Sequence, residues 1–105
     1  MRTKLAEITD QLKYRDGHNE TKEGKSWRLA NSMCDDNEHL NNLYDIFFND
    51  RFLPAGRIQA AMGAAKQVTA FNCFVSPKIE DDFGSIFEVL KKAGQTLRLG
   101  GGEGF

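Results

Sequence analysis

The sequence predicts a mainly α fold with one or two β-strands, in which a helical N-terminal segment leads into an α/β unit. Two observations support this prediction. Apolar residues recur at helical spacing in several stretches of the chain. Residues 67–75 instead alternate, with β-branched and aromatic side chains in the majority. A length of 105 residues is enough for one small domain or for a piece of a larger one.

Composition excludes several classes of protein. The chain is 40% apolar and 28% charged, which is ordinary for a globular protein. Its 14 Lys and Arg against 15 Asp and Glu give a net charge of −1, whereas a nucleic-acid or membrane-surface binder would show a basic excess. We find no apolar run of membrane-spanning length and no apolar signal core at the N-terminus. We therefore expect a cytoplasmic protein with neither nucleic acid nor membrane as a partner.

The chain divides into three expected parts. Residues 1–20 form an N-terminal arm or a short helix over 3–13, because Leu5, Ile8 and Leu12 recur at helical spacing. Residues 21–66 form a helical segment. Residues 67–105 supply a strand, a helix and a Gly-rich loop.

Within residues 21–66 we expect two helices. The first is capped by Thr21 and ends at residues 35–37, which also cap the second. The residues predicted to share the buried face of the first helix are Trp27, Ala30, Asn31 and Cys34. The second helix has a strong apolar stripe, made of Leu40, Leu43, Tyr44, Phe47 and Phe48. Pro54 and Gly56 then break the helical pattern.

Residues 67–75 are predicted to form the one clear strand. Both of its faces carry apolar residues, which is typical of a central strand covered on both sides. A helix follows from Asp81, and its expected apolar face consists of Phe83, Ile86, Phe87, Leu90, Ala93 and Leu97. We recognise no second strand to pair with the first. The sequence therefore predicts a fragment, incomplete by itself, whose strand needs another polypeptide.

The glycines at 100–104 leave two interpretations open. A phosphate loop of the Walker type needs Gly-Lys-Ser/Thr, and a dinucleotide fingerprint follows a strand, so neither motif is present. The segment is therefore either a helix C-cap with a turn, or a backbone that approaches a ligand closely.

The two cysteines have different settings. Cys34 and Cys73 lack the spacing of zinc sites, and we predict no metal site. Cys34 is expected to be a packing residue. Cys73 is predicted to be buried among Phe71, Phe74 and Val75, but its neighbour Asn72 is unusual in an apolar strand. An Asn-Cys pair there indicates either a core thiol or a site that lines a cavity.

Three segments carry a resemblance to a known family. They are residues 51–57 (RFLPAGR), 71–77 (FNCFVSP) and 99–105 (LGGGEGF), in this order and with a helix before the last. Over residues 21–105 the chain resembles the N-terminal portion of ribonucleotide reductase large chains, most closely the adenosylcobalamin-dependent class, including phage versions. One departure is Glu103, at a position that is usually apolar in the family.

The resemblance implies a fold, a reaction and a site. The fold is a ten-stranded α/β barrel behind a helical segment, of which this chain has the first strand and helix. In the reaction a thiyl radical, generated with adenosylcobalamin, abstracts the ribose 3′-hydrogen, and two further cysteines reduce the ribonucleotide. By resemblance Cys73 is one of these two, and Asn72, Cys73 and Gly102 lie against the substrate. The second reducing cysteine, the radical cysteine and the cobalamin-binding residues lie outside this chain.

The implied partners are the remainder of the reductase chain, a ribonucleotide and a thioredoxin-like or other dithiol reductant. The implied setting is the cytoplasm of a bacterium or of a phage-infected cell. By this interpretation the chain is inactive by itself. The alternative is a small helical interaction protein, without catalysis, whose strand augments a partner's sheet. A third alternative is a thiol redox sensor, which would need an exposed, low-pKa cysteine, whereas Cys73 is predicted to be buried.

Overall fold

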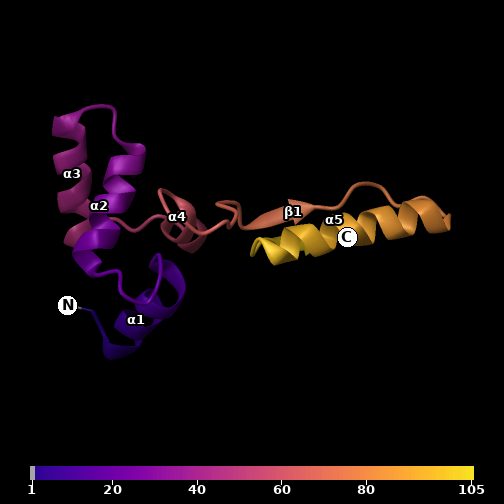
Figure 1. The fold of residues 1–105 in the computed structure, drawn as a ribbon, viewed down its shortest axis with the longest axis horizontal. Helices are drawn as coiled ribbons and strands as arrows, with labels where there is room; N and C mark the ends of the chain where they lie inside the picture. The colour runs from indigo at the N-terminus through magenta and orange to yellow at the C-terminus, as the bar shows by residue number, and fades with distance from the viewer. Residues whose placement is uncertain (1) are drawn as a thin grey trace. The chain divides into compact units, whose positions relative to one another are not determined.

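The computed structural model describes residues 2–105, which divide into two compact units between Ala70 and Phe71. The first unit is helical and the second combines two strands with one helix (Figure 1). The elements of the first unit are α1 (Lys4–Thr9), the π-helix η1 (Asp10–Tyr14), α2 (Lys22–Met33), α3 (Asn37–Phe48) and α4 (Gly56–Ala61). Those of the second are β1 (Cys73–Val75), α5 (Phe83–Arg98) and β2 (Gly102–Gly104). The chain is therefore mainly helical with two short parallel strands.

Side chains cap the three longest helices at their N-termini. Thr21 caps α2, Asp36 caps α3 and Asp82 caps α5. In each case a side-chain oxygen accepts a hydrogen bond from the backbone N–H three residues later, at 2.8–3.1 Å. Such a cap is worth about 1 kcal/mol to its helix. The predicted start at Thr21 and the predicted capping at residues 35–37 are confirmed.

The core of the first unit lies between α2 and α3, which run side by side (Figure 1). Its fully buried residues are Leu29, Ala30 and Phe47. The stripe predicted for α3 is confirmed, since Leu40 and Phe47 are buried. The other members of the stripe, Leu43, Tyr44 and Phe48, are partly buried.

The buried face predicted for the first helix is confirmed at Ala30 and wrong at Trp27 and Asn31, which are exposed. It consists of Ser26, Leu29 and Ala30 with Met33 partly buried, whereas Trp27 is 51% exposed. The indole lies edge-on to Tyr44 of α3, with ring centroids 6.1 Å apart. Ser26 tolerates burial because its hydroxyl donates to the carbonyl of Lys22 at 2.9 Å.

Residues 4–14 are helical, which is one of the two alternatives expected for the N-terminal part, but the apolar side of this helix is not the buried one. Thr3 caps α1, and η1 continues the helix to Tyr14. Leu5 and Leu12 stay 74% and 67% exposed, while the buried residue is Asp10. The helix α4 was not predicted from its small residues.

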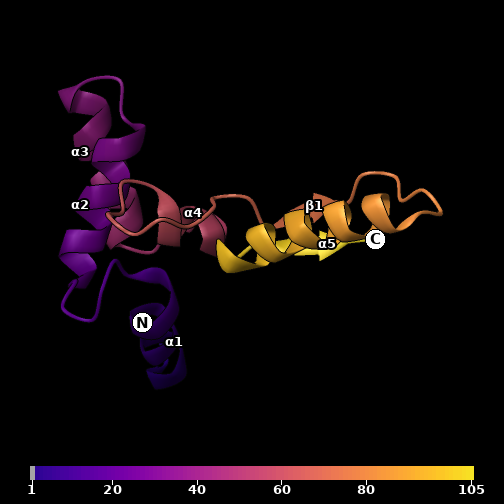
Figure 2. The same cartoon turned by 45° about the vertical axis from the view of Figure 1, so that its right-hand side comes forward.

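The second unit is a βαβ arrangement (Figure 2). β1 and β2 pair in parallel with Cys73 opposite Gly102, and α5 connects them. The expectation that the strand has no partner within the chain is therefore wrong. The strand is also shorter than the predicted 67–75, because β2 offers only three residues to pair with it.

Candidate functional site

The pairing of β1 with β2 brings the three predicted site residues together. Cys73 and Gly102 are partners in the ladder, although 28 residues separate them in the chain. The backbone N–H of Gly102 donates to the carbonyl of Asn72 at 2.8 Å. One pair of strand segments therefore holds Asn72, Cys73 and Gly102 as neighbours.

Cys73 lies on the face of the sheet that points away from α5. The ring of Phe74 lies beside Gly101 and Thr96, so Phe74 points toward the helix. Because side chains alternate along a strand, Cys73 and Val75 point to the other face.

The prediction that Cys73 is buried is wrong. Cys73 and Asn72 are both exposed, and Val75 is 93% exposed. The apolar alternation of β1 predicted two covered faces, but among the described residues only α5 covers this small sheet, and on one side. The thiol is therefore accessible to a reactant.

Cys34 differs from Cys73 in its surroundings. It is half-buried just after α2, and its Sγ lies 3.5 Å from the carbonyl oxygen of Asn31. Cys34 thus lies at the helix end rather than on the buried face of α2.

The two interpretations that the sequence left open for the glycine segment apply to different residues: Gly100 and Gly101 end a helix, and the backbone of Gly102 lies beside Cys73. Gly100 has a φ of 88°, a left-handed conformation that glycine adopts at little cost. The N–H of Gly100 donates to Leu97, and that of Gly101 donates to Thr96, at 3.0 and 3.1 Å. These two hydrogen bonds form the Schellman motif that ends α5. Gly102 then begins β2 with its backbone beside Cys73.

Glu103 is an unusual residue for its position. It pairs with Phe74 in the ladder and so belongs to the face toward α5. Its Oε2 atom is buried and has no hydrogen-bond partner among the described residues. Leaving a buried polar atom unpaired costs about 1–3 kcal/mol. An apolar residue at position 103 would avoid this cost and would therefore fit the position better.

A second chemically notable group, which the hydropathy pattern of the sequence does not reveal, lies in the first unit. Asp10 and Lys25 form a buried ion pair, and Arg2 and Arg15 also contact the Asp10 carboxylate, at 3.3 and 2.9 Å. Lys25 also donates to Gln59 at 3.0 Å. Burial alone would raise the pKa of Asp10, but hydrogen bonds from Lys25 and Arg15 outweigh it and hold that pKa below 3.8.

This ionic cluster borders an open cavity of about 440 Å³ whose lining is mainly apolar. Leu5, Ala6 and Leu53 supply much of that lining. Asp10 and Lys25 are satisfied by partners within the protein. We therefore assign the cluster to the stability of the first unit.

Residues 2–105 bring together no group of three or more His, Cys, Asp or Glu side chains that could hold a metal ion. No helix among them is both long and apolar enough to cross a bilayer. Comparison with family models, with curated proteins and with solved structures finds no match to this chain.

Proposed function

We propose that this chain is the N-terminal part of a ribonucleotide reductase and that Cys73 is one of its two reducing thiols. The observation that supports this best is the position of Cys73, exposed on β1 and directly opposite Gly102. A thiol that reacts with a bound substrate must be accessible. The glycine opposite leaves room for a ribose to approach the backbone closely.

The proposed reaction consumes two thiols for each ribonucleotide. Cys73 and a second cysteine on another polypeptide each give up one proton and one electron, and the two sulfurs form a disulfide. The ribose 2′-hydroxyl leaves as water, and hydrogen takes its place. A dithiol reductant then restores the two thiols by disulfide exchange.

Asn72 and Gly102 have positioning roles in this proposal. Asn72 directly precedes Cys73 in the chain and its side chain is exposed, and amides both donate and accept hydrogen bonds. It can therefore bind a ribose hydroxyl. A Cβ at Gly102 would lie 3.7 Å from the sulfur of Cys73, in the space that we assign to the sugar.

Adenosylcobalamin, the cofactor of the reductase class that this chain resembles, does not fit the residues that the structure describes around Cys73. The face of the sheet that carries Cys73 otherwise presents Val75, Gly102 and Gly104, none of which has a polar side chain. A corrin needs several polar contacts and a deep pocket. We therefore assign adenosylcobalamin binding to the other polypeptide and derive no step through it.

The need for another polypeptide follows from the small sheet. Two three-residue strands leave outer edges that no strand among residues 2–105 pairs. Unpaired edges are templates for further strands. We propose that the rest of the barrel adds to these edges and covers Cys73.

The test is a reductase assay with the complete assembly. The chain is combined with a polypeptide that supplies the remaining barrel strands and the radical cysteine, together with a ribonucleotide, adenosylcobalamin and a dithiol. We expect turnover with the wild-type chain and none with either polypeptide alone. Cys73→Ser should abolish multiple turnover, because no disulfide can form.

Cys34→Ala is the matched control, since it removes the other thiol of the same chain. It should retain turnover and cost only about 1 kcal/mol of stability. Full multiple turnover by the Cys73→Ser assembly would contradict the proposal.

One observation favours a second function. The same open edges of β1 and β2 suit a non-catalytic protein that augments a partner's sheet. Such a protein has no use for a thiol at position 73. Partner binding that survives Cys73→Ser, with no deoxyribonucleotide formed by the wild-type complex, would favour this alternative.

A further inference from the structure

The cavity of the first unit has the size of a small-molecule binding site. Its volume of about 440 Å³ falls within the usual range for such sites, about 300–1,000 Å³. At about 30 Å³ for each water molecule, this is the room of about 15 waters, far more than a single hydration site needs. The lining comes from residues 2–14 and from residues 50–59, and it is mainly apolar.

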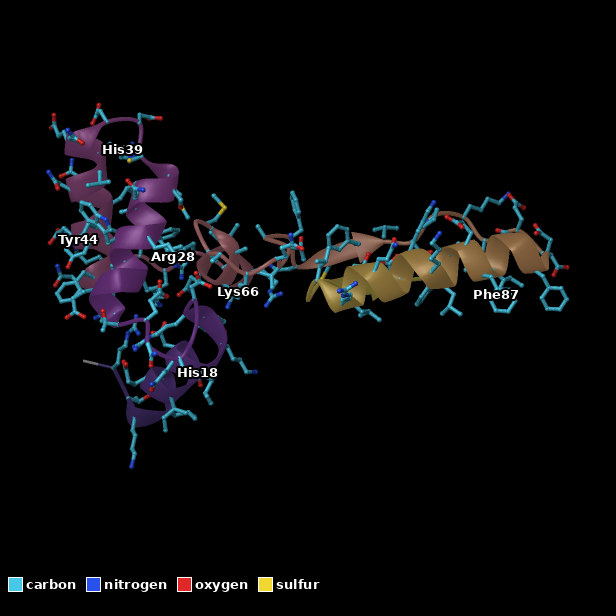
Figure 3. The ribbon with its side chains drawn as sticks, in the orientation of Figure 1. His18, Arg28, His39, Tyr44, Lys66 and Phe87 are labelled. Carbon is cyan, nitrogen blue, oxygen red and sulfur yellow. The ribbon has the colours of Figure 1, made fainter. Side chains whose placement is uncertain are left out.

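Contacts outside the cavity hold its walls in place. Arg28 of α2 donates hydrogen bonds to the backbone carbonyls of Tyr14 in η1 and Gln59 in α4, at 3.4 and 3.0 Å. Figure 3 shows Arg28 on the side of α2 that faces α4. The ring of Tyr14 also packs against Gly56 at the start of α4, where a Cβ would lie 2.6 Å from it. Walls that are already fixed lose little conformational entropy when a ligand binds.

The charged side chains that line the cavity are paired within the protein. Arg2 donates to both carboxylate oxygens of Asp50, and Asp10 accepts from Lys25 and Arg15. A charged ligand would meet only charges that already have partners, and it would lose hydration against apolar walls. The cavity therefore favours a neutral ligand.

Two polar side chains of the lining each keep a hydrogen-bond donor for a ligand. Gln59 is only 5% exposed; its Oε1 accepts from Lys25 and its Nε2 donates to the carbonyl of Pro54 at 2.7 Å. One of its two amide N–H bonds thus has no acceptor among residues 2–105. The Thr3 hydroxyl accepts from the backbone N–H of Ala6 at 3.2 Å, and its own O–H remains to donate. Donors of this kind suit a hydroxyl or carbonyl oxygen.

We propose that this cavity binds a neutral, mainly apolar small molecule that has one hydroxyl or carbonyl oxygen. Its apolar part lies against Leu5, Ala6 and Leu53, and its oxygen accepts a hydrogen bond from Gln59 or Thr3. The inference does not depend on the proposed reductase function, because every lining residue belongs to the first unit and the thiol site belongs to the second.

Titration of the 105-residue chain with 1-octanol, followed by NMR of the methyl groups, tests the proposal. We expect saturable binding, with shifts at Leu5, Ala6 and Leu53 and none at the exposed Leu90 of α5. Octanoate and octylammonium have the same chain length and opposite charges. Each should bind more weakly than 1-octanol by about fivefold or more, because a charge loses hydration in the cavity.

A variant that fills the cavity should abolish this binding. Ala6→Phe adds a ring to the lining from an exposed position of α1 and should weaken 1-octanol binding by about tenfold or more. Ile8→Phe is the matched control, since it places the same ring on the same helix at an exposed position outside the lining. It should leave the dissociation constant within about twofold.

A second variant keeps the test decisive if circular dichroism shows that Ala6→Phe loses helix. Leu53→Asp lies outside the helices and places a carboxylate in the apolar lining, so it should also weaken binding by about tenfold or more. Tighter binding of octanoate or octylammonium than of 1-octanol would contradict a neutral ligand. Equal shifts at Leu90, binding unchanged by both Ala6→Phe and Leu53→Asp, or no saturable binding up to the solubility of 1-octanol would overturn the proposal.

Discussion

The ring of Phe74 occupies the space that a side chain at Gly101 would need. A Cβ at Gly101 would lie 2.6 Å from a carbon of this ring and 3.0 Å from the methyl group of Thr96. Only glycine allows the end of α5 and the middle of β1 to approach so closely. The neighbouring Gly102 has no such restriction, since its nearest contacts would be ordinary ones at 3.5 and 3.7 Å.

We therefore predict that alanine substitutions at two adjacent glycines, Gly101 and Gly102, differ in their effect on stability. Gly101→Ala should lower the free energy of unfolding of the second unit by about 1–3 kcal/mol, because the ring of Phe74 must move. Gly102→Ala should change it by no more than about 0.5 kcal/mol. Urea unfolding, followed by amide exchange at β1, measures both. Equal losses of stability in the two variants would show that the contact with the ring of Phe74 does not restrict position 101 to glycine.

Removing the carboxylate of Glu103, whose Oε2 atom is buried without a partner among the described residues, should stabilise the second unit. Glu103→Met keeps the length of the side chain and removes a buried oxygen that lacks a partner among the described residues. We expect a gain of about 1–3 kcal/mol in the free energy of unfolding. Glu88→Met, at an exposed position of α5, is the control and should have little effect. A loss of stability in Glu103→Met would mean that this carboxylate has a partner in solution.

The ion pair between Asp10 and Lys25 should show strong coupling. Asp10→Ala leaves the Lys25 ammonium buried, with Gln59 as its remaining hydrogen-bond partner, and should cost about 3–5 kcal/mol. Adding Lys25→Met to this variant should restore much of that loss, because no unpaired charge remains in the interior. A double-mutant cycle measured by urea unfolding gives the coupling energy. If the losses of stability caused by Asp10→Ala and by Lys25→Met simply added up, the two side chains would not be coupled as a buried ion pair.

Lowering the pH should reduce the free energy of unfolding of the first unit, because the Asp10 carboxylate becomes protonated. The pKa of Asp10 in the folded state lies below 3.8, so the folded state binds fewer protons than the unfolded chain in acid. The stabilisation is fully present well above the ordinary pKa of a carboxyl group, and it is lost as the pH falls through the folded-state pKa. Asp50 acts in the same direction: burial would raise its pKa, but Arg2 and Lys22 outweigh burial. Urea unfolding between about pH 2 and pH 6 should show this loss, and Asp10→Asn should reduce it.

The two thiols should differ in their rate of alkylation. Cys73 is exposed and Cys34 is half-buried, so iodoacetamide should modify Cys73 first. Mass spectrometry of the intact chain, with Cys73→Ser and Cys34→Ser as references, follows each site separately. Faster modification of Cys34 would contradict the exposed placement of Cys73.

The sequence predicted the helices best where capping residues and apolar spacing agree. The Thr21 cap and the stripe around Phe47 on α3 are such cases. On α2 the prediction failed because hydropathy does not register polar side chains whose hydrogen bonds are satisfied, such as Ser26 and Lys25. An apolar pattern alone therefore placed Trp27 in the core.

The second strand could not be predicted because its residues have no strand preference. Gly102–Gly104 contains neither a β-branched nor an aromatic side chain, and it forms a strand through backbone pairing with β1. The exposure of Cys73 was missed for a related reason. Apolar alternation shows that both faces can be covered, but it does not show which chain covers them. The residue types alone singled out the Asn72-Cys73 pair as either a core thiol or a cavity-lining site. The roles of Asn72, Cys73 and Gly102 toward a substrate came from the family resemblance.

The single tryptophan of this chain, Trp27, contacts Tyr44 edge-on, so its fluorescence reports on the folding of the first unit alone. Its fluorescence follows the separation of α2 from α3, while the second unit has no indole. Circular dichroism sums the helices of both units, including α5. The two signals should therefore give melting curves with different midpoints, and a two-state fit to either signal alone will misstate the stability of the whole chain.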